Sequence, residues 1–207
     1  MRRDQLEHAI RTACQIIEHP AVVVVGSQSI LGTYPEDELP PGATMSREVD
    51  ILPLADTNDE TGRLADLIVG VAGEWSPFEE QHGFSIDGVD LDTAVLPEGW
   101  RERLVKVQNA NTAASSGSPQ FIGWCLDKED LCVSKLCAHR EKDLNFVAAL
   151  LAAGCCRPRL LMTAASSSVE TCCVEKGAPP EGSGGALVVR LSRRWSLCRD
   201  FGDGCSC

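Results

Sequence analysis

The feature of this sequence that most restricts its fold is the stretch from residue 22 to residue 51. It opens with a β-branched apolar run that ends at Val25, which is typical of a fully buried strand. Gly26 and Ser27 end that run. After a polar loop, Glu48 and Asp50 alternate with apolar residues, and this alternation predicts a second strand. Two carboxylates one residue apart on a strand point to the same face. The stretch therefore predicts a sheet with a Gly-Ser turn on one strand and paired acids on the next.

The rest of the first three quarters of the chain predicts helices around that sheet. Thr57 followed by Glu60 is a capping box that opens a helix. Asp87-Gly88 is a tight turn between two apolar segments, which predicts a β-hairpin over residues 84–95. Apolar periodicity predicts further helices at residues 4–18, 127–139 and 141–153, and a strand at 121–126. The expected fold is of the α/β (α+β) class, a small mixed sheet flanked by helices with a helical C-terminal part at 127–153.

The chain changes character near Gly154. Seven of its 11 cysteines lie beyond that residue, among Gly-, Ser- and Pro-rich segments with weak periodicity. No two cysteines have the C-x-x-C spacing of a zinc site. We expect one domain over residues 1–153 and a disordered, low-order tail over 154–207. A shifted reading frame would explain the tail, and a natural disordered extension is the alternative.

Charge and hydropathy exclude several classes of function. The formal net charge is −11, which argues against a broad surface for nucleic-acid phosphates but not against a small nucleotide bridged by a metal ion. No segment has the roughly 18 to 20 consecutive apolar residues that span a bilayer, so no membrane association is expected. The N-terminal segment lacks an apolar signal core, and we expect a cytoplasmic protein.

The Gly-Ser turn and the paired acids together suggest phosphate chemistry. Gly26 and Ser27 offer backbone N–H groups and a hydroxyl to a phosphate, and Glu48 and Asp50 are suited to hold one or two Mg²⁺ (or Mn²⁺) ions. A third carboxylate is expected from the hairpin. Asp90 and Asp92 share a face there, and Asp92 is preferred because it lies further from the turn. The alternative is that the first pair forms an ordinary turn and the second a solvated strand face.

In order and spacing, these motifs resemble the DNA polymerase β-like nucleotidyltransferase superfamily, whose pattern is Gly-Ser or Gly-Gly followed by Asp-x-Asp. Gly26 and Ser27 match the first motif. Glu48 and Asp50 fall on the paired carboxylates, with Glu in place of the more usual first Asp. The resemblance implies a nucleotidyltransferase fold and a metal-dependent transfer of a nucleoside monophosphate from a nucleoside triphosphate.

Two later segments sharpen the resemblance. The residues from Leu96 to Leu104, and those from Asp130 through Lys135 and Arg140 to Asp143, look like a little-characterised bacterial nucleotidyltransferase family. That family is similar to abortive-infection type toxins of toxin–antitoxin systems. The match implies that Lys135 contacts phosphate and that Asp143 serves near the nucleophile or nucleotide. It also implies an RNA, protein or small-molecule acceptor and an antitoxin partner.

The same segments allow less functional interpretations. Without the resemblance, Lys135 is an exposed helix lysine, and Arg140 and Asp143 are a surface pair three residues apart. The glutamate at the first acidic position favours an alternative function, a catalytically inactive nucleotidyltransferase-like module that binds a partner protein.

Overall fold

A computed structural model describes residues 1–157 of the chain, and its elements follow the predicted order closely. The described helices are α1 (Arg3–Ile17), α2 (Asn58–Ala72), α3 (Pro77–His82), α4 (Lys128–Ala138) and α5 (Glu141–Ala152), and the strands are β1 (Ala21–Val24), β2 (Glu48–Pro53), β3 (Ser85–Gly88), β4 (Val105–Val107) and β5 (Ile122–Cys125). Short 3-10 helices include η1 (Ser27–Gly32) and η3 (Pro41–Ala43). None of the helices in residues 1–157 combines the length and the apolar character needed to cross a membrane.

The five strands form one mixed sheet in the order β3-β2-β1-β5-β4. β1 is antiparallel to β2 and parallel to β5, while β3 is parallel to β2 and β4 is antiparallel to β5. The mixed sheet with flanking helices confirms the predicted fold class. The antiparallel β1–β2 pair brings the end of β1 beside the start of β2, which is where the sequence carries its Gly-Ser turn and its paired acids.

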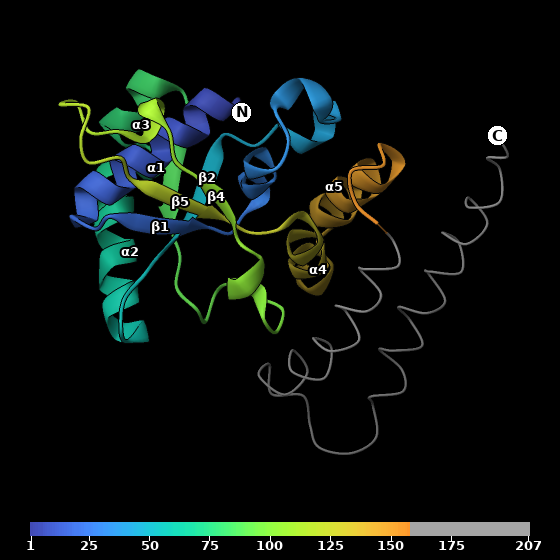
Figure 1. Ribbon diagram of the computed structural model, residues 1–207. Coiled ribbons are helices and arrows are strands. Elements are labelled where there is room, and N and C mark those ends of the chain that lie inside the picture. The colour runs from blue at the N-terminus through green and yellow to red at the C-terminus, as the bar shows by residue number, and fades with distance from the viewer. Residues whose placement is uncertain (158–207) are drawn as a thin grey trace, which may run out of the picture. The chain divides into compact units, whose positions relative to one another are not determined.

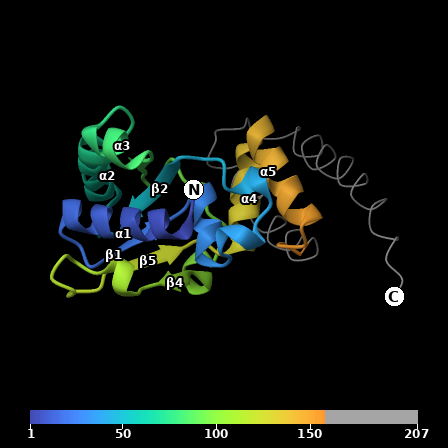
Figure 2. The ribbon, with the colours of Figure 1, turned by 90° about the horizontal axis from the view of Figure 1, so that it is seen from above.

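Helices α1 and α2 cover one face of the sheet (Figures 1 and 2). The apolar positions of α1 recur with helical spacing, and residues such as Leu6 and Ile10 are fully buried. Ile10 lies so close to β5 that a Cβ on Gly123 would be 2.2 Å from its Cδ1. Gly123 therefore sets the distance between α1 and the sheet.

An irregular segment, residues 89–104, covers part of the opposite face. Val23, Val25 and Leu52 form a buried cluster there, against which side chains of this segment pack, including Trp100. The segment is fixed to α4 by Arg103, whose guanidinium donates to both carboxylate oxygens of Asp130 at 2.8 and 2.9 Å. One face of the sheet is thus helical and the other is covered by an irregular segment.

The pair α4 and α5 lies beyond the end of the sheet, away from α2 (Figure 1). Asp127 caps α4 by accepting a hydrogen bond from the Glu129 amide, as its position in the sequence predicts. α4 contacts η1, and α5 contacts η3. The packed part of the chain runs past residue 153, since Cys155 and Cys156 are both buried. The predicted tail lies outside the described residues from 158 onwards.

The predicted β-hairpin over residues 84–95 is wrong. Val89–Val95 forms no strand, and β3 instead pairs in parallel with β2 after the α2–α3 crossover. Gly88 is the reason that the turn signal misleads. A Cβ at Gly88 would lie 2.1 Å from the carbonyl oxygen of Ala65, so this glycine allows α2 to approach β3 closely. The short helix α3 was not predicted, although Ser76 followed by Pro77 is a helix-start signal.

Candidate active site

Three carboxylates on neighbouring strands converge at one point. Glu48, Asp50 and Asp87 each offer an oxygen, and these oxygens all lie within 4.8 Å of one another. Glu48 is exposed, and the other two are partly buried. Glu48 and Asp50 have the same two-residue period on β2 as Leu52, so they point to the face covered by residues 89–104. We call this group the acidic triad.

The third member of the triad is Asp87 and not the predicted Asp92. The parallel register pairs Asp50 directly with Asp87, which places the two side chains on the same face. Asp92 lies beyond the strand, and its carboxylate accepts a hydrogen bond from Asn58 at 2.9 Å. Asp90 accepts from the Thr93 amide in a turn. Neither belongs to the group of acids that could hold a metal ion among residues 1–157.

The triad is electrostatically strained because its members repel one another. Burial, the neighbouring Asp87 and a hydrogen bond between the two carboxyl groups raise the pKa of Glu48. Burial and the charge of Glu48 raise the pKa of Asp50, and burial and the charge of Asp50 raise the pKa of Asp87. Three acids with raised pKa values at one point favour either a shared proton or a bound cation.

The chemistry of the donor set fits a hard divalent cation. Mg²⁺ and Mn²⁺ prefer carboxylate oxygen, and Mg²⁺ is usually held by only one or two protein carboxylates plus water and substrate phosphate. The glutamate at position 48 reaches the same point as Asp50 and Asp87, even though its side chain is one methylene longer. The Glu-for-Asp replacement therefore leaves the three oxygens together.

Gly26 lies directly against the triad. A Cβ on Gly26 would be 1.4 Å from Oδ2 of Asp50, so no other residue fits there while Asp50 keeps its position. The adjoining strands are held by a hydrogen bond from the Val25 amide to the Asp50 carbonyl oxygen at 3.1 Å. Ser27 follows at the start of η1 and is partly buried. The Gly-Ser turn and the paired acids, 20 or more residues apart in the sequence, thus meet in one place.

A cationic group from α4, α5 and the residue that caps α5 acts on the charge of the triad. The charges of Lys135, Arg140 and Lys142 all act to lower the pKa of Asp50. Lys142 acts in the same direction on Glu48. The charges of α4 and α5 thus balance part of the repulsion within the triad, on the side where these helices lie.

Asp143 is not part of the triad but holds two of these cations. It is 2% exposed, and its oxygens lie 2.6 Å from Nε of Arg140 and 3.3 Å from Nζ of Lys135. Burial raises its pKa, but the hydrogen bond from Arg140 and the charge of Lys135 outweigh this and keep the pKa below its ordinary value. Lys135 is itself largely buried, at 12% side-chain exposure, and so is not the freely exposed helix lysine of the simpler interpretation.

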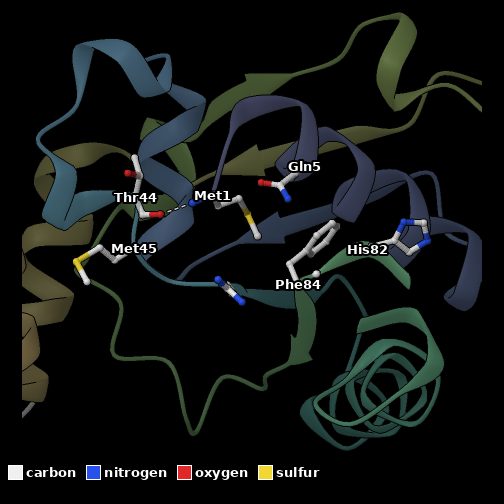
Figure 3. Close-up of a pocket in the computed structure, with 8 residues that line it drawn as sticks. Met1, Gln5, Thr44, Met45, His82 and Phe84 are labelled. Carbon is white, nitrogen blue, oxygen red and sulfur yellow. Dashed lines mark hydrogen bonds between the residues drawn. The ribbon is translucent and has the colours of Figure 1, made fainter. Parts of the chain in front are cut away.

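A cavity of about 410 Å³ opens beside the amino-terminal ends of β2 and β3. Its lining includes Arg47 and Phe84, the residues immediately before those two strands, together with Gln5 of α1 and His82 of α3 (Figure 3). By the same two-residue period, Arg47 lies on the helix-covered face, opposite to the triad. The cavity was not predicted, because it forms where elements distant in the sequence meet.

Sequence reasoning missed Asp87, Arg140 and Lys142. Asp87-Gly88 was interpreted as a hairpin turn, whereas both residues lie in β3. Arg140 belongs to the segment that carries the family resemblance, but the sequence assigned it no role beyond a surface pair with Asp143. Its role in holding a buried carboxylate depends on the α4–α5 packing, which no local pattern reveals.

Comparisons with known proteins give one match. Neither the curated proteins nor the solved structures contain a significant match to this chain. A family model described as a nucleotidyltransferase of unknown function (DUF6036) matches residues 4–172. This span includes the Gly-Ser turn, the acidic triad and the cationic group, and it continues past residue 153, the expected end of the domain. The chain belongs to this family of nucleotidyltransferases of unknown function.

Proposed function

We propose that this protein is a metal-dependent nucleotidyltransferase that moves a nucleoside monophosphate from a nucleoside triphosphate to an acceptor. The observation that carries the proposal is the acidic triad, with three carboxylate oxygens within 4.8 Å of one another beside the Gly-Ser turn. Such a cluster is costly for a fold to maintain unless a cation neutralises it. Transfer of phosphoryl groups depends mainly on positioning and charge neutralisation, which this arrangement can supply.

In this proposal the residues divide into two sides. Glu48, Asp50 and Asp87 would hold Mg²⁺ or Mn²⁺, which neutralises phosphate charge when bound. The Gly26 backbone and Ser27 would hold the triphosphate against Asp50. Lys135 would neutralise phosphate charge from the opposite side.

Asp143 takes a different role from the one that the sequence resemblance implies. Its carboxylate is occupied by Lys135 and Arg140, so in the proposal it orients these cations and does not contact the nucleophile. A buried carboxylate paired with two cations holds their long side chains in place before phosphate binds. These side chains then lose less conformational entropy when they bind phosphate.

The proposal extends to an RNA, protein or small-molecule acceptor and to a toxin–antitoxin or defence setting with an antitoxin partner. The support for this setting, and for a closer relation to abortive-infection type enzymes, is the motif resemblance between Leu96 and Asp143. The relation to DNA polymerase β-like enzymes is supported by the Gly-Ser turn and the paired acids of β2. The net charge of −11 favours acceptors bound through few phosphates over long nucleic acids.

A transfer assay tests the proposal. The full chain is incubated with each α-labelled ribonucleoside triphosphate, Mg²⁺ or Mn²⁺, and extract as the source of acceptor. We expect label to transfer to a macromolecule or small molecule in a metal-dependent way, and Asp50→Asn to abolish it. Asp66→Asn, the same change at an exposed position of α2, is the matched control and should be active. Transfer by none of the nucleotides, with metal binding unaltered in Asp50→Asn, would favour the inactive partner-binding module.

A further inference from the structure

Helix α2 packs one side against the sheet and carries large apolar side chains on its outer side. The buried side faces β2 and β3 and consists of Thr61, Ala65, Ile68 and Ala72. Leu67 and Val71 lie off that side and are each 53% exposed. The helix lies at the end of the sheet away from α4 and α5 (Figure 1). Because the outer side of an amphipathic helix is ordinarily polar, exposed Leu67 and Val71 indicate a contact surface.

Four outward positions along α2 and just beyond it have the spacing of a helix-pairing seam. They are separated by four, three and four residues, which keeps side chains on one face of a helix, and they are Arg63, Leu67, Gly70 and Glu74. All four are exposed, and the Arg63 side chain is 76% exposed. A Cβ added at Gly70 would point into open space. Glu74 follows the end of the helix by two residues. We call these four residues the α2 seam.

The α2 seam is complementary to itself. In an antiparallel pair of α2 helices related by a two-fold axis, position 63 lies opposite position 74, and position 67 lies opposite position 70. Arg63 then faces Glu74 of the partner subunit, and Leu67 occupies the open space at Gly70 of the partner subunit. Symmetry makes each contact twice. A parallel pair would instead place Arg63 beside a second Arg63 and Glu74 beside a second Glu74, so repulsion between like charges disfavours that direction.

We propose that α2 pairs with α2 of a second copy of this chain, in an antiparallel, two-fold symmetric dimer held by the α2 seam. The paired acids of β2 point to the face of the sheet that residues 89–104 cover, whereas α2 covers the other face. Both acidic triads therefore stay accessible in the dimer. The helix has 15 residues and is about 22 Å long. A contact of this length is small for a protein interface, so the dimer has a dissociation constant in the micromolar range, on the order of 1 to 10 μM.

A protein of unrelated sequence is the alternative occupant of the same face. The net charge of −11 makes two copies of the chain repel each other at a distance. The α2 seam itself carries one basic and one acidic residue, so the contact between two seams is neutral. An unrelated partner requires no relation between Arg63 and Glu74 or between Leu67 and Gly70. A single two-fold axis matches both pairs at once, and this match favours a second copy.

Sedimentation velocity tests the pairing through its charges. The full chain is measured in EDTA and reducing agent from about 1 to 100 μM, where we expect a monomer–dimer equilibrium. Arg63→Glu and Glu74→Arg should each weaken association at least about tenfold, because each places like charges opposite each other twice. The double variant Arg63→Glu/Glu74→Arg has the net charge of the wild type and restores both opposite-charge contacts. Its dimer should form with an affinity within about threefold of that of the wild type.

Apolar variants of the same helix test the register. Leu67→Ala should weaken the dimer at least about tenfold, because two leucines lose their contact. Val69→Ala is the matched control, since Val69 is 40% exposed on α2 but lies off the seam, and it should associate as the wild type does. Circular dichroism of each variant checks that the monomer keeps its fold.

Three outcomes overturn the pairing. The first is a full chain that is monomeric throughout the concentration range, which leaves the face to an unrelated partner. The second is a dimer that survives both Arg63→Glu and Leu67→Ala, which assigns the contact to another surface. The third is a double variant that fails to restore the dimer. Because the measurements use neither nucleotide nor metal, each of these outcomes leaves the transferase proposal standing.

Discussion

Replacing Asp50 with asparagine should stabilise the metal-free protein while removing its response to metal. Asp50 has a raised pKa because it is buried and lies beside Glu48. A carboxyl group whose pKa is raised on folding stabilises the folded state fully at pH values below its unfolded-state pKa, which is near 4 for aspartate. This stabilisation is lost as the pH rises through the pKa of the folded state. At pH 7 to 8 the charged carboxylate is therefore a cost to the folded state, and a neutral amide of the same shape avoids that cost.

The size of the effect follows from the triad geometry. Oxygens of Asp50, Glu48 and Asp87 lie within 4.8 Å of one another. Two charges at that separation repel by about 1 kcal/mol in water and by about 3.5 kcal/mol at an effective dielectric constant near 20. The charges of Lys135 and Arg140 offset part of this repulsion. A net gain of about 1 to 2 kcal/mol for Asp50→Asn would raise Tm by about 2 to 8 °C in a protein of this size.

The assay is thermal unfolding of both proteins in EDTA and in Mn²⁺. In EDTA at pH 8, Asp50→Asn should unfold at the higher temperature, and the gap should close below about pH 4, where the wild-type acids are protonated. With Mn²⁺ at 100 times its dissociation constant, the wild type should gain about 2.7 kcal/mol and the variant little. A variant that is less stable than the wild type in EDTA at pH 8 would refute the reasoning, because it would mean that the cations outweigh the repulsion within the triad.

Three further predictions address the surroundings of the triad. Gly26→Ala should abolish metal binding and nucleotide transfer, because its Cβ would lie 1.4 Å from Oδ2 of Asp50. Gly62→Ala is the control, because the space around its Cβ is open. It should behave as the wild type in calorimetry and in transfer assays. Arg103→Met should lower the free energy of unfolding by about 3 kcal/mol in urea titrations, because Asp130 is 1% exposed and would lose its partner; a loss under 1 kcal/mol would contradict this. Mn²⁺ affinity measured by calorimetry should fall as the pH is lowered towards and through the raised pKa values of the triad, since protons and metal compete for the same oxygens; a flat profile from pH 8 to 5 would count against a carboxylate site.

Much of the fold could be predicted because its signals are local. The helical period of α1, the Thr57 cap of α2 and the Asp127 cap of α4 are each encoded within a few residues. The Gly-Ser turn and the acids of β2 were located for the same reason. Their juxtaposition follows from the antiparallel pairing of β1 with β2, a direction that the sequence pattern did not specify.

The third carboxylate could not be predicted from local signals. Asp87-Gly88 has the sequence of a hairpin turn, but its glycine is required by the closeness of the α2 backbone, and the strand register places its aspartate beside Asp50. Both requirements come from the β2–α2–β3 crossover. A parallel edge strand such as β3 depends on contacts between segments distant in the sequence. The residues at its end have the composition of a turn, so local patterns predict a turn there instead of a strand.

The cationic group shows the same limit in the helical part. Lys135 and Asp143 were singled out by resemblance, but their ion pair depends on the way α4 packs against α5. The three-residue spacing of Arg140 and Asp143 is common on exposed helices, and nothing in it indicates that Asp143 is buried.

The most direct test of the central claim compares Asp87→Asn with Asp92→Asn in a calorimetric titration of Mn²⁺ in the presence of a non-hydrolysable nucleoside triphosphate. Both changes remove one carboxylate from the same stretch of chain, and only Asp87 lies in the triad. The geometry predicts that Asp87→Asn weakens Mn²⁺ binding at least tenfold and abolishes nucleotide transfer, while Asp92→Asn binds and transfers as the wild type does. Normal Mn²⁺ binding in Asp87→Asn, or its loss in Asp92→Asn, would contradict the proposed metal site.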